Sequence, residues 1–234
     1  MLIGITALTA ALGAFLVVVR AEELVRLREL PFSGHIRHPC GATPRPRSRA
    51  PTELREYSVA FYRYMAAYSA LYRRDANRAA NQSTMNDCEF LNLPTIPNTP
   101  NLSDLMATDE EEALQQIHSS LLLHAAYAYF VEHQFATASG SCSEASLERE
   151  RKLAQEALVL ARKQKHMACL TQMTLDELGF ARNATDALLD ARFADLRLCS
   201  RRALRDCQVM LSIGQLLDSI GNYAKSILDS LERN

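Results

Sequence analysis

Apolar residues recur every three or four positions in four long stretches of the chain, which is the spacing of one face of an α-helix. The first stretch opens at Pro51 with an acid two residues later, a combination typical of a helix start. The other three begin near Thr108, Ser143 and Asp195. No stretch has the alternation of apolar and polar residues that marks a half-buried strand. The pattern therefore predicts an all-α fold.

Each predicted helix presents one apolar line, which we expect to face a shared core. The line of the first helix is mostly aromatic, and that of the fourth contains small residues that would let a neighbouring helix approach closely. In chain order, the four lines consist of Leu54, Tyr57, Phe61, Tyr64, Tyr68 and Leu71; of Leu114, Ile117, Leu121, Ala125, Ala128, Val131 and Phe135; of Leu147, Ala154, Ala157, Leu160 and Ala168; and of Cys207, Met210, Gly214, Leu217, Gly221, Ala224, Leu228 and Leu231.

The lengths of the connections indicate how the helices are joined. The first connection, about residues 80–107, and the third, about 175–194, are long, whereas the second, about 136–143, is short. A short link forces antiparallel neighbours, while a link of about 28 residues can return the chain along a helix of about 42 Å. The order long, short, long predicts an up-up-down-down four-helix bundle of the growth hormone and cytokine type, and an up-down-up-down bundle is the weaker alternative.

The start of the chain is typical of a secretory signal peptide, which we place at residues 1–21. No charge interrupts the apolar run Leu2–Val19. A basic start is missing and the cleavage site is poor, so a retained membrane anchor stays an alternative. Residues 22–50 are basic and rich in turns, which predicts an extended leader, and the bundle domain then occupies residues 51–234.

Three acceptor patterns for N-glycosylation occur along the chain, at Asn81, Asn101 and Asn183. One such pattern is close to chance, whereas three in segments that we expect to be loops or helix ends support the secretory route. We therefore predict a secreted, extracellular glycoprotein.

Composition and motifs argue against several classes of function. The chain has 234 residues and a formal net charge of -1, whereas nucleic-acid binding normally requires a basic surplus. It contains no glycine-rich phosphate loop, no Gly-x-Ser-x-Gly elbow and no His-Glu-x-x-His metal motif. We therefore expect no enzymatic activity, no catalytic residue, no metal or cofactor, no small-molecule substrate and no nucleic-acid partner.

The six cysteines show no zinc-binding spacing. Cys199 and Cys207 lie on one predicted helix, roughly 12 Å apart along its axis, which is too far for a disulfide between them. Disulfides must therefore tie loops to helices, and six cysteines allow about fifteen complete pairings. The other cysteines are Cys40, Cys88, Cys142 and Cys169.

The order and spacing of four of these cysteines resemble the interleukin-6 family of helical cytokines, most closely its leukaemia inhibitory factor and oncostatin M branch. Cys40 precedes the first helix and Cys169 lies late in the third, while Cys88 lies in the first long connection and Cys207 early in the fourth helix. The resemblance covers about residues 40–234. Its short segments are His166-Met-Ala-Cys-Leu-Thr-Gln172, Arg205-Asp-Cys-Gln-Val-Met-Leu211 and Leu91-Asn-Leu-Pro94, the last being similar to the loop before the second helix of interleukin-6.

The resemblance implies disulfides between Cys40 and Cys169 and between Cys88 and Cys207. Cys142 and Cys199 are left over, and they could pair with each other, stay free or bridge to a partner chain. The branch also carries a Phe-x-x-Lys pair at the head of the fourth helix, where this chain has Ser200 and Ala203. The side chains of the family's usual contact with its second receptor chain are thus missing.

The function that the resemblance implies is that of a cytokine which brings class I cytokine receptor chains together, including the family's shared signal-transducing chain. One site would use the outward faces of the first and third helices, with Val159 as the best single contact, and a second the end of the fourth helix. The expected receptor-binding residues are Glu56, Arg63 and Arg74; Lys152, Gln155, Val159, Lys163 and His166; and Lys225, Asp229 and Arg233.

Two alternatives differ in kind from a cytokine that acts alone. An unpaired Cys142 or Cys199 would favour a helical subunit that works only with a receptor-like partner chain, as in the interleukin-12 group. Persistence of residues 1–20 in the mature protein would favour a membrane-anchored helical bundle with a structural role.

Overall fold

The computed structural model describes residues 24–26, 39–41, 50–82, 96, 99–137, 143–181, 188–190 and 199–233. The predicted signal peptide and most of the predicted leader lie outside these residues. The described helices are α3 (Pro51–Gln82), α4 (Leu102–Ala107), α5 (Glu110–Thr137), α6 (Glu144–Leu178) and α8 (Cys199–Arg233). The all-α prediction is thereby confirmed for the main elements, because all four predicted helices are present.

Two short strands are an addition that the apolar pattern did not predict. β1 (Leu24–Arg26) pairs antiparallel with β2 (Leu188–Asp190), and Val25 lies opposite Leu189. Three residues are too few to show the alternation by which a strand is recognised in a sequence. Part of the predicted leader is therefore paired with the connection between α6 and α8.

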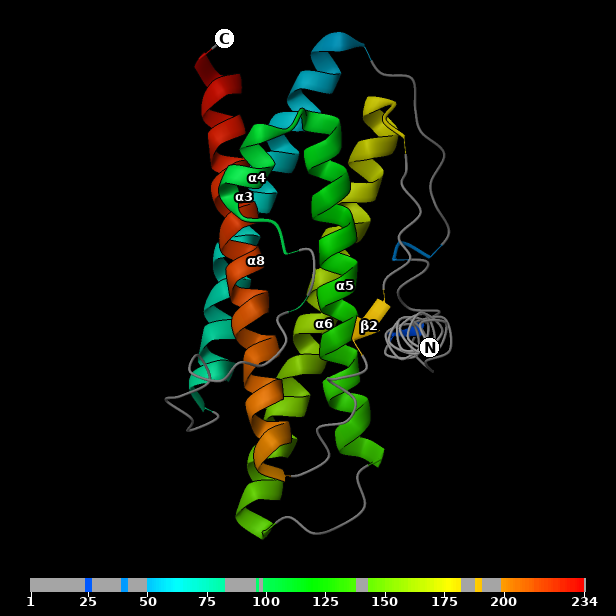
Figure 1. Ribbon diagram of the computed structural model, residues 1–234. Coiled ribbons are helices and arrows are strands. Elements are labelled where there is room, and N and C mark those ends of the chain that lie inside the picture. Colours follow the sequence, from blue (N-terminus) through cyan, green and yellow to red (C-terminus); the bar gives the residue numbers. More distant parts are fainter. Residues whose placement is uncertain are drawn as a thin grey trace, which may run out of the picture.

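The four long helices lie side by side, with α3 and α5 running in one direction and α6 and α8 in the other (Figure 1). The side-chain pairs between α3 and α8 show the opposite directions of these two helices. Tyr62 meets Tyr223, whereas Arg73, further along α3, meets Asp218, which is earlier in α8. α3 packs mainly against α8 and also against α6, and α5 packs mainly against α6 and also against α8.

α4 lies in the first long connection and was missed by the sequence analysis. The Asn101 side chain accepts a hydrogen bond from the Asp104 N–H at 2.9 Å, and the Asp104 carboxylate accepts one from the Asn101 N–H at 3.1 Å. This reciprocal capping box fixes the start of the helix. Leu105 is fully buried, and α4 packs against α8 and α5. One and a half turns are too short to show a helical period.

Local signals fix the ends of two long helices. At the start of α5, the Asp109 carboxylate accepts a hydrogen bond from the Glu112 N–H at 2.8 Å, so Asp109 is the N-cap of this acidic first turn. α6 ends at Leu178 and is followed by Gly179, whose φ of 76° is the left-handed conformation that glycine adopts most easily. The Phe180 N–H donates to the Leu175 carbonyl at 2.9 Å, which completes a Schellman motif.

The inner face of α3 differs from the predicted aromatic line, which is a correction. Phe61 is buried as predicted, but Leu71 is 44% exposed. The remaining members of the line, Leu54, Tyr57, Tyr64 and Tyr68, are half-buried. The innermost positions are instead taken by Ser58, Tyr62, Met65, Ser69, Tyr72 and Ala76. The true face is rotated by about one residue, because small residues as well as apolar ones line the contact with α8.

The predicted small residues of α8 lie where α3 comes closest. A Cβ on Gly214 would stand 2.5 Å from the Asn77 Oδ1, and one on Gly221 would stand 3.2 Å from the Ser69 Cβ. The expectation of a close approach at these glycines is confirmed, and the neighbour is α3. The rest of the α8 line is buried from Cys207 to Ala224, whereas its last members are half-buried.

The apolar lines of α5 and α6 are buried as predicted except at their ends, where Phe135 and Leu147 are half-buried. α5 is the most deeply placed helix, since every residue from Ser120 to Val131 is buried. In the part of the chain that the structure describes, no helix has the length and apolar character needed to cross a membrane.

Candidate functional site

The seam between α3 and α6 is built from large aromatic side chains rather than from small residues. The rings of Tyr64 and Tyr68 are stacked with centroids 4.0 Å apart, and Tyr68 contacts Tyr72 edge-on. From α6, His166 contacts the edge of Tyr64, and the Lys163 Nζ lies 4.8 Å from the centre of the Tyr72 ring. Burial raises the pKa of Tyr64, helped by its tyrosine neighbours, so its phenol stays neutral.

An ion pair joins α3 and α6 at one point along this seam. The Lys163 Nζ lies 2.7 Å from one carboxylate oxygen of Asp75, whose other oxygen pairs with Arg78 at 3.0 Å. The Lys163 and Asp75 side chains are only 28% and 14% exposed. Lys163, predicted as a free outward contact, is therefore held against α3 by Asp75 and Tyr72.

Two large apolar side chains remain exposed on this side of the molecule. Leu71 of α3 is 44% exposed and Val159 of α6 is 43% exposed. Val159 lies one turn before Lys163 on α6, and Leu71 lies one turn before Asp75 on α3, so both flank the Lys163–Asp75 pair. Exposed apolar residues that cluster beside aromatic and charged groups are typical of protein-binding surfaces.

The structure brings together only some of the predicted residues of the first site. Lys152, Gln155, Val159 and His166 are exposed on α6, with Lys163 half-buried between them. Arg74 is exposed on α3 next to Asp75. The other two predicted residues of α3, Glu56 and Arg63, lie elsewhere.

Arg63 is exposed, and its predicted part in receptor binding stays a prediction, but the structure shows a contact with α8. Its guanidinium pairs with Glu232 of α8 at 2.8 Å, so it belongs to the opposite seam of α3. Glu56 is exposed near the start of α3, roughly 27 Å along the helix from Arg74. Leu71 and Tyr64, which the sequence analysis placed in the core, are the α3 residues that accompany Val159 and His166. The true inner face of α3 is rotated by about one residue from the predicted face, and the sequence analysis missed this rotation.

The predicted second site lies at the last turns of α8, where Lys225, Asp229 and Arg233 are exposed. The Arg233 Nε donates to the Asp229 carbonyl at 2.9 Å within the helix. α4, which packs against α8, exposes Leu102 and Met106 by 36% and 50%. This second apolar pair is one turn apart on a helix that the sequence analysis did not predict.

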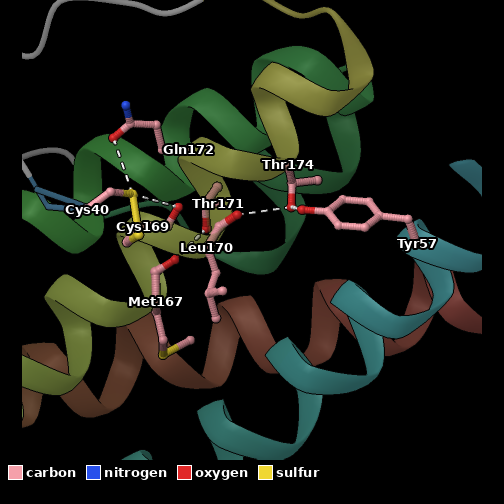
Figure 2. Close-up of a disulfide and its surroundings, with 8 residues drawn as sticks. All are labelled: Cys40, Tyr57, Met167, Cys169, Leu170, Thr171, Gln172 and Thr174. Carbon is pink, nitrogen blue, oxygen red and sulfur yellow. Dashed lines mark hydrogen bonds between the residues drawn. A yellow bond between two sulfur atoms is a disulfide. The ribbon is translucent and has the colours of Figure 1, made fainter. Parts of the chain in front are cut away.

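A disulfide joins Cys40 to Cys169 of α6, with their Cα atoms 4.8 Å apart (Figure 2). It joins the two cysteines that the family resemblance pairs. Nearby, the Tyr57 hydroxyl of α3 lies 3.3 Å from the Thr174 hydroxyl of α6, so the two helices also touch at this end of the seam (Figure 2).

Cys207 is also disulfide-bonded. Its Sγ lies 3.8 Å from the Ala80 carbonyl oxygen in the last turn of α3. The prediction that its partner is Cys88 lies outside the described residues, as do those for Cys142 and for glycosylation at Asn183. Of the other two predicted glycosylation positions, Asn81 and Asn101 are exposed.

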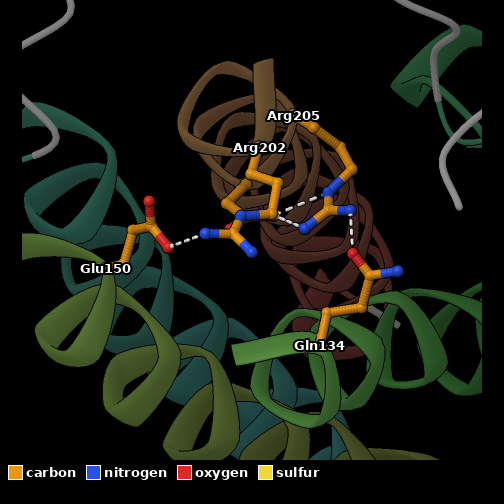
Figure 3. Close-up of polar contacts among 5 residues, drawn as sticks. Gln134, Glu150, Arg202 and Arg205 are labelled. Atoms are coloured by element: carbon orange, nitrogen blue, oxygen red, sulfur yellow. Dashed lines mark hydrogen bonds and ion pairs between the residues drawn. The ribbon is translucent and has the colours of Figure 1, made fainter. Parts of the chain in front are cut away.

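Buried charges gather where α5, α6 and α8 meet, away from the α3–α6 seam (Figure 3). Arg202 of α8 pairs with Glu150 of α6 at 2.9 Å, and both side chains are about nine-tenths buried. Arg205 donates to Gln134 of α5 and to Asp206. Burial raises the pKa of Asp206, although Arg205 beside it lowers this pKa. These contacts link α5, α6 and α8, which indicates a structural cluster.

His124 of α5 is completely buried and links three segments. Its Nδ1 lies 2.8 Å from the Ser120 carbonyl, so Nδ1 donates and Nε2 accepts. Nε2 lies 3.1 Å from the Ser212 Oγ of α8 and 3.2 Å from the Thr99 Oγ1 of the first connection. Burial lowers the pKa of His124 to about 4, so the ring is neutral at physiological pH. This is a satisfied core histidine.

Among the described residues, no group of three or more His, Cys, Asp or Glu side chains is placed to hold a metal ion. Comparison of the chain with family models, with curated proteins and with solved structures finds no significant match. The candidate site therefore stands on its own geometry, as a partly apolar surface along α3 and α6.

Proposed function

We propose that the protein is a secreted helical cytokine of the interleukin-6 type, which brings class I cytokine receptor chains together. The observation that carries the proposal is the arrangement of the long helices, with α3 and α5 opposed to α6 and α8 and a short link only between α5 and α6. These directions support the proposed up-up-down-down topology. The Cys40–Cys169 disulfide agrees with the pairing of the leukaemia inhibitory factor and oncostatin M branch.

In this proposal the α3–α6 surface is the first receptor site. Leu71 and Val159 are the apolar anchors, and Tyr64, Tyr68 and His166 lie along the same seam. Full burial of a side chain of this size is worth about 1.5–3 kcal/mol. A few such residues at the centre of an interface dominate the binding energy, while charged residues at its rim set orientation and rate.

The second receptor site uses the end of α8, where Lys225, Asp229 and Arg233 are exposed. We place the exposed pair Leu102 and Met106 of α4 beside it, because α4 packs against α8. The family's shared signal-transducing chain is the partner proposed for the α3–α6 surface. At the head of α8 this chain has Ser200 and Ala203 in place of the Phe-x-x-Lys pair of the branch. The proposal therefore includes no third receptor contact there.

Binding of the secreted protein to soluble ectodomains of class I cytokine receptor chains tests this function. The double variant Leu71→Glu/Val159→Glu should weaken binding to the shared chain by about 30-fold or more, because it places two charges in an interface that excludes water. Ala70→Glu is the matched control. It adds a carboxylate to an exposed position of α3 on the stripe of Arg63 and Arg73, which faces α8.

The control variant should bind within about twofold of the unsubstituted protein, a difference of less than 0.5 kcal/mol. Failure of the unsubstituted protein to bind any class I receptor chain would refute the proposed function. Equal binding by the double variant and the control would instead remove the receptor site from the α3–α6 surface.

A further inference from the structure

Charge is separated along the bundle, although the whole chain has a formal net charge of only -1. The starts of α3 and α5 lie at the same end as the last turns of α6 and α8 (Figure 1), and acidic residues outnumber basic ones there. A net charge near zero therefore does not exclude separate acidic and basic regions on the bundle, which a partner would meet separately. The acidic residues at this end include Glu53, Glu56, Asp109, Glu110, Glu111, Glu112, Asp176, Glu177, Asp229 and Glu232.

The outward side of α6 and the adjoining part of α3 form a basic region. On α6 it extends from Lys152 to Lys165, about 20 Å along the axis, and the acidic residue within that stretch is Glu156. We call the following six residues the basic band: Arg74, Arg78, Lys152, Arg162, Lys163 and Lys165.

Most of the basic band has no internal counter-charge. Asp75 pairs with both Arg78 and Lys163, which neutralises part of their charge. The described residues provide no carboxylate partner for the other four members. Three of these are exposed and one, Lys165, is half-buried. The four are Arg74, Lys152, Arg162 and Lys165.

We propose that the basic band binds a linear sulfated polysaccharide of the heparin type. The exposed Lys152 and Arg162, unpaired among the described residues, lie about 15 Å apart along α6, so repeated anionic groups of a stiff chain can contact both and release counterions. The band also extends beyond the apolar pair. Burial raises the pKa of Tyr129 of α5, and Arg162 lies close enough to this phenol to offset part of that rise, on the side of α6 away from α3.

A nucleic acid fits the band less well. Single-stranded nucleic acids need aromatic faces on which bases stack. The tyrosine rings beside the band are in contact with one another and with side chains of α6, as for Tyr64 with Tyr68 and for Tyr72 with Lys163. The polysaccharide proposal does not use the apolar residues Leu71 and Val159, but it shares Arg74, Lys152 and Lys163 with the expected receptor contacts.

Heparin oligosaccharides of defined length provide the probe, with titration calorimetry of the full-length secreted protein at about 0.15 M salt and at two higher concentrations. The double variant Lys152→Gln/Arg162→Gln should weaken binding about tenfold or more. It should also reduce the slope of log Kd against log salt by about one for each lost contact. The matched control, Lys225→Gln/Arg233→Gln, removes the same charge from the acidic end of the bundle and should stay within about twofold.

Thermal unfolding of both variants should match that of the unsubstituted protein, since all four positions are exposed. Equal weakening by the two double variants would overturn the proposal, because the binding would then follow net charge alone. It is also overturned if heparin binds no tighter than dextran without sulfate groups, or if single-stranded DNA of equal length competes with heparin at equal concentration.

Discussion

α3 packs against its two neighbours by different means. Gly214 and Gly221 of α8 allow α3 to approach α8 closely. Exposed ion pairs from Arg63 to Glu232 and from Arg73 to Asp218 line this seam. Against α6, bulky tyrosines hold the helices apart, and a disulfide ties α6 to the chain before α3. The α3–α8 seam is closely packed, whereas the α3–α6 seam leaves apolar side chains exposed at the surface. Close packing is typical of a structural contact, whereas the open seam offers a binding surface.

The largest expected effect comes from the disulfide that ties the open seam. Its cysteines are 129 positions apart, and removing such a cross-link costs about 4–5 kcal/mol by the chain-entropy argument. We expect Cys40→Ser/Cys169→Ser to lower the free energy of unfolding by this amount, as measured by denaturant titration with the Cys207 disulfide intact. A loss below about 1 kcal/mol would mean that α6 is held by packing alone, and the contrast between the seams would fail.

The contribution of the buried His124, which joins α5 to α8, to the free energy of unfolding should depend on pH in the acid range. The pKa of His124 is about 4 in the folded chain and about 6.5 when unfolded, so the unfolded chain binds more protons between these values. His124 should therefore contribute no pH dependence above about pH 6.5, and should cost about 3 kcal/mol as pH falls to about 4. The raised pKa of Asp206 acts in the opposite sense.

Comparison with His124→Gln isolates the histidine contribution. The variant keeps an amide that can bond with Ser120 or Ser212, and it does not titrate in this range. Denaturant titrations at pH 7 and at pH 4 should show a smaller loss for the variant than for the parent protein. Parallel losses would assign the acid response to other groups.

A larger side chain should damage the closed seam more than the open one. Gly221→Leu forces atoms against Ser69, where even a Cβ would be 3.2 Å from the Ser69 Cβ. Overpacking of this kind costs about 1–3 kcal/mol, partly offset by the better helix propensity of leucine. Thermal unfolding should therefore reveal destabilisation for Gly221→Leu. Ala67→Leu, at an exposed position, should change the free energy of unfolding by less than about 0.5 kcal/mol.

The smallest effect on stability is expected at the apolar pair itself. Leu71 and Val159 are more than two-fifths exposed, so replacing either with glutamate should change the free energy of unfolding by only about 0.5 kcal/mol. The same variants should weaken receptor binding strongly. A loss of stability comparable with that of Gly221→Leu would show that the two seams are alike, and that the apolar pair is part of the core.

The sequence predicted the helices well because their signals are local. The periodic apolar residues of α5 and α8 and the proline-acid start of α3 each depend on neighbours within one or two turns. The same reasoning located the close approach at Gly214 and Gly221. It missed α4 and both strands, because three to six residues contain too little of any period to be recognised.

The candidate site was predicted only in part. Val159, Gln155 and Lys152 were placed correctly on the outward side of α6, since its core face is marked by small and aliphatic residues. On α3, apolar residues occur on more than one side, so pattern alone put Leu71 inside, and it did not predict the ion pair of Arg63 with α8. The pairing of Lys163 with Asp75 and Tyr72 joins two helices and leaves no local signal.

The sequence by itself therefore determined the helical class, the main boundaries and the small residues of the tightest contact, because these follow from spacing along one chain. Only the tertiary structure decided which side of α3 faces α8, which charges are paired and which remain exposed on α6. Each of these depends on the rotation of one helix against another. A rotation by one residue turns Leu71 from a core position into the surface, and the pattern of apolar residues along a single helix cannot fix it.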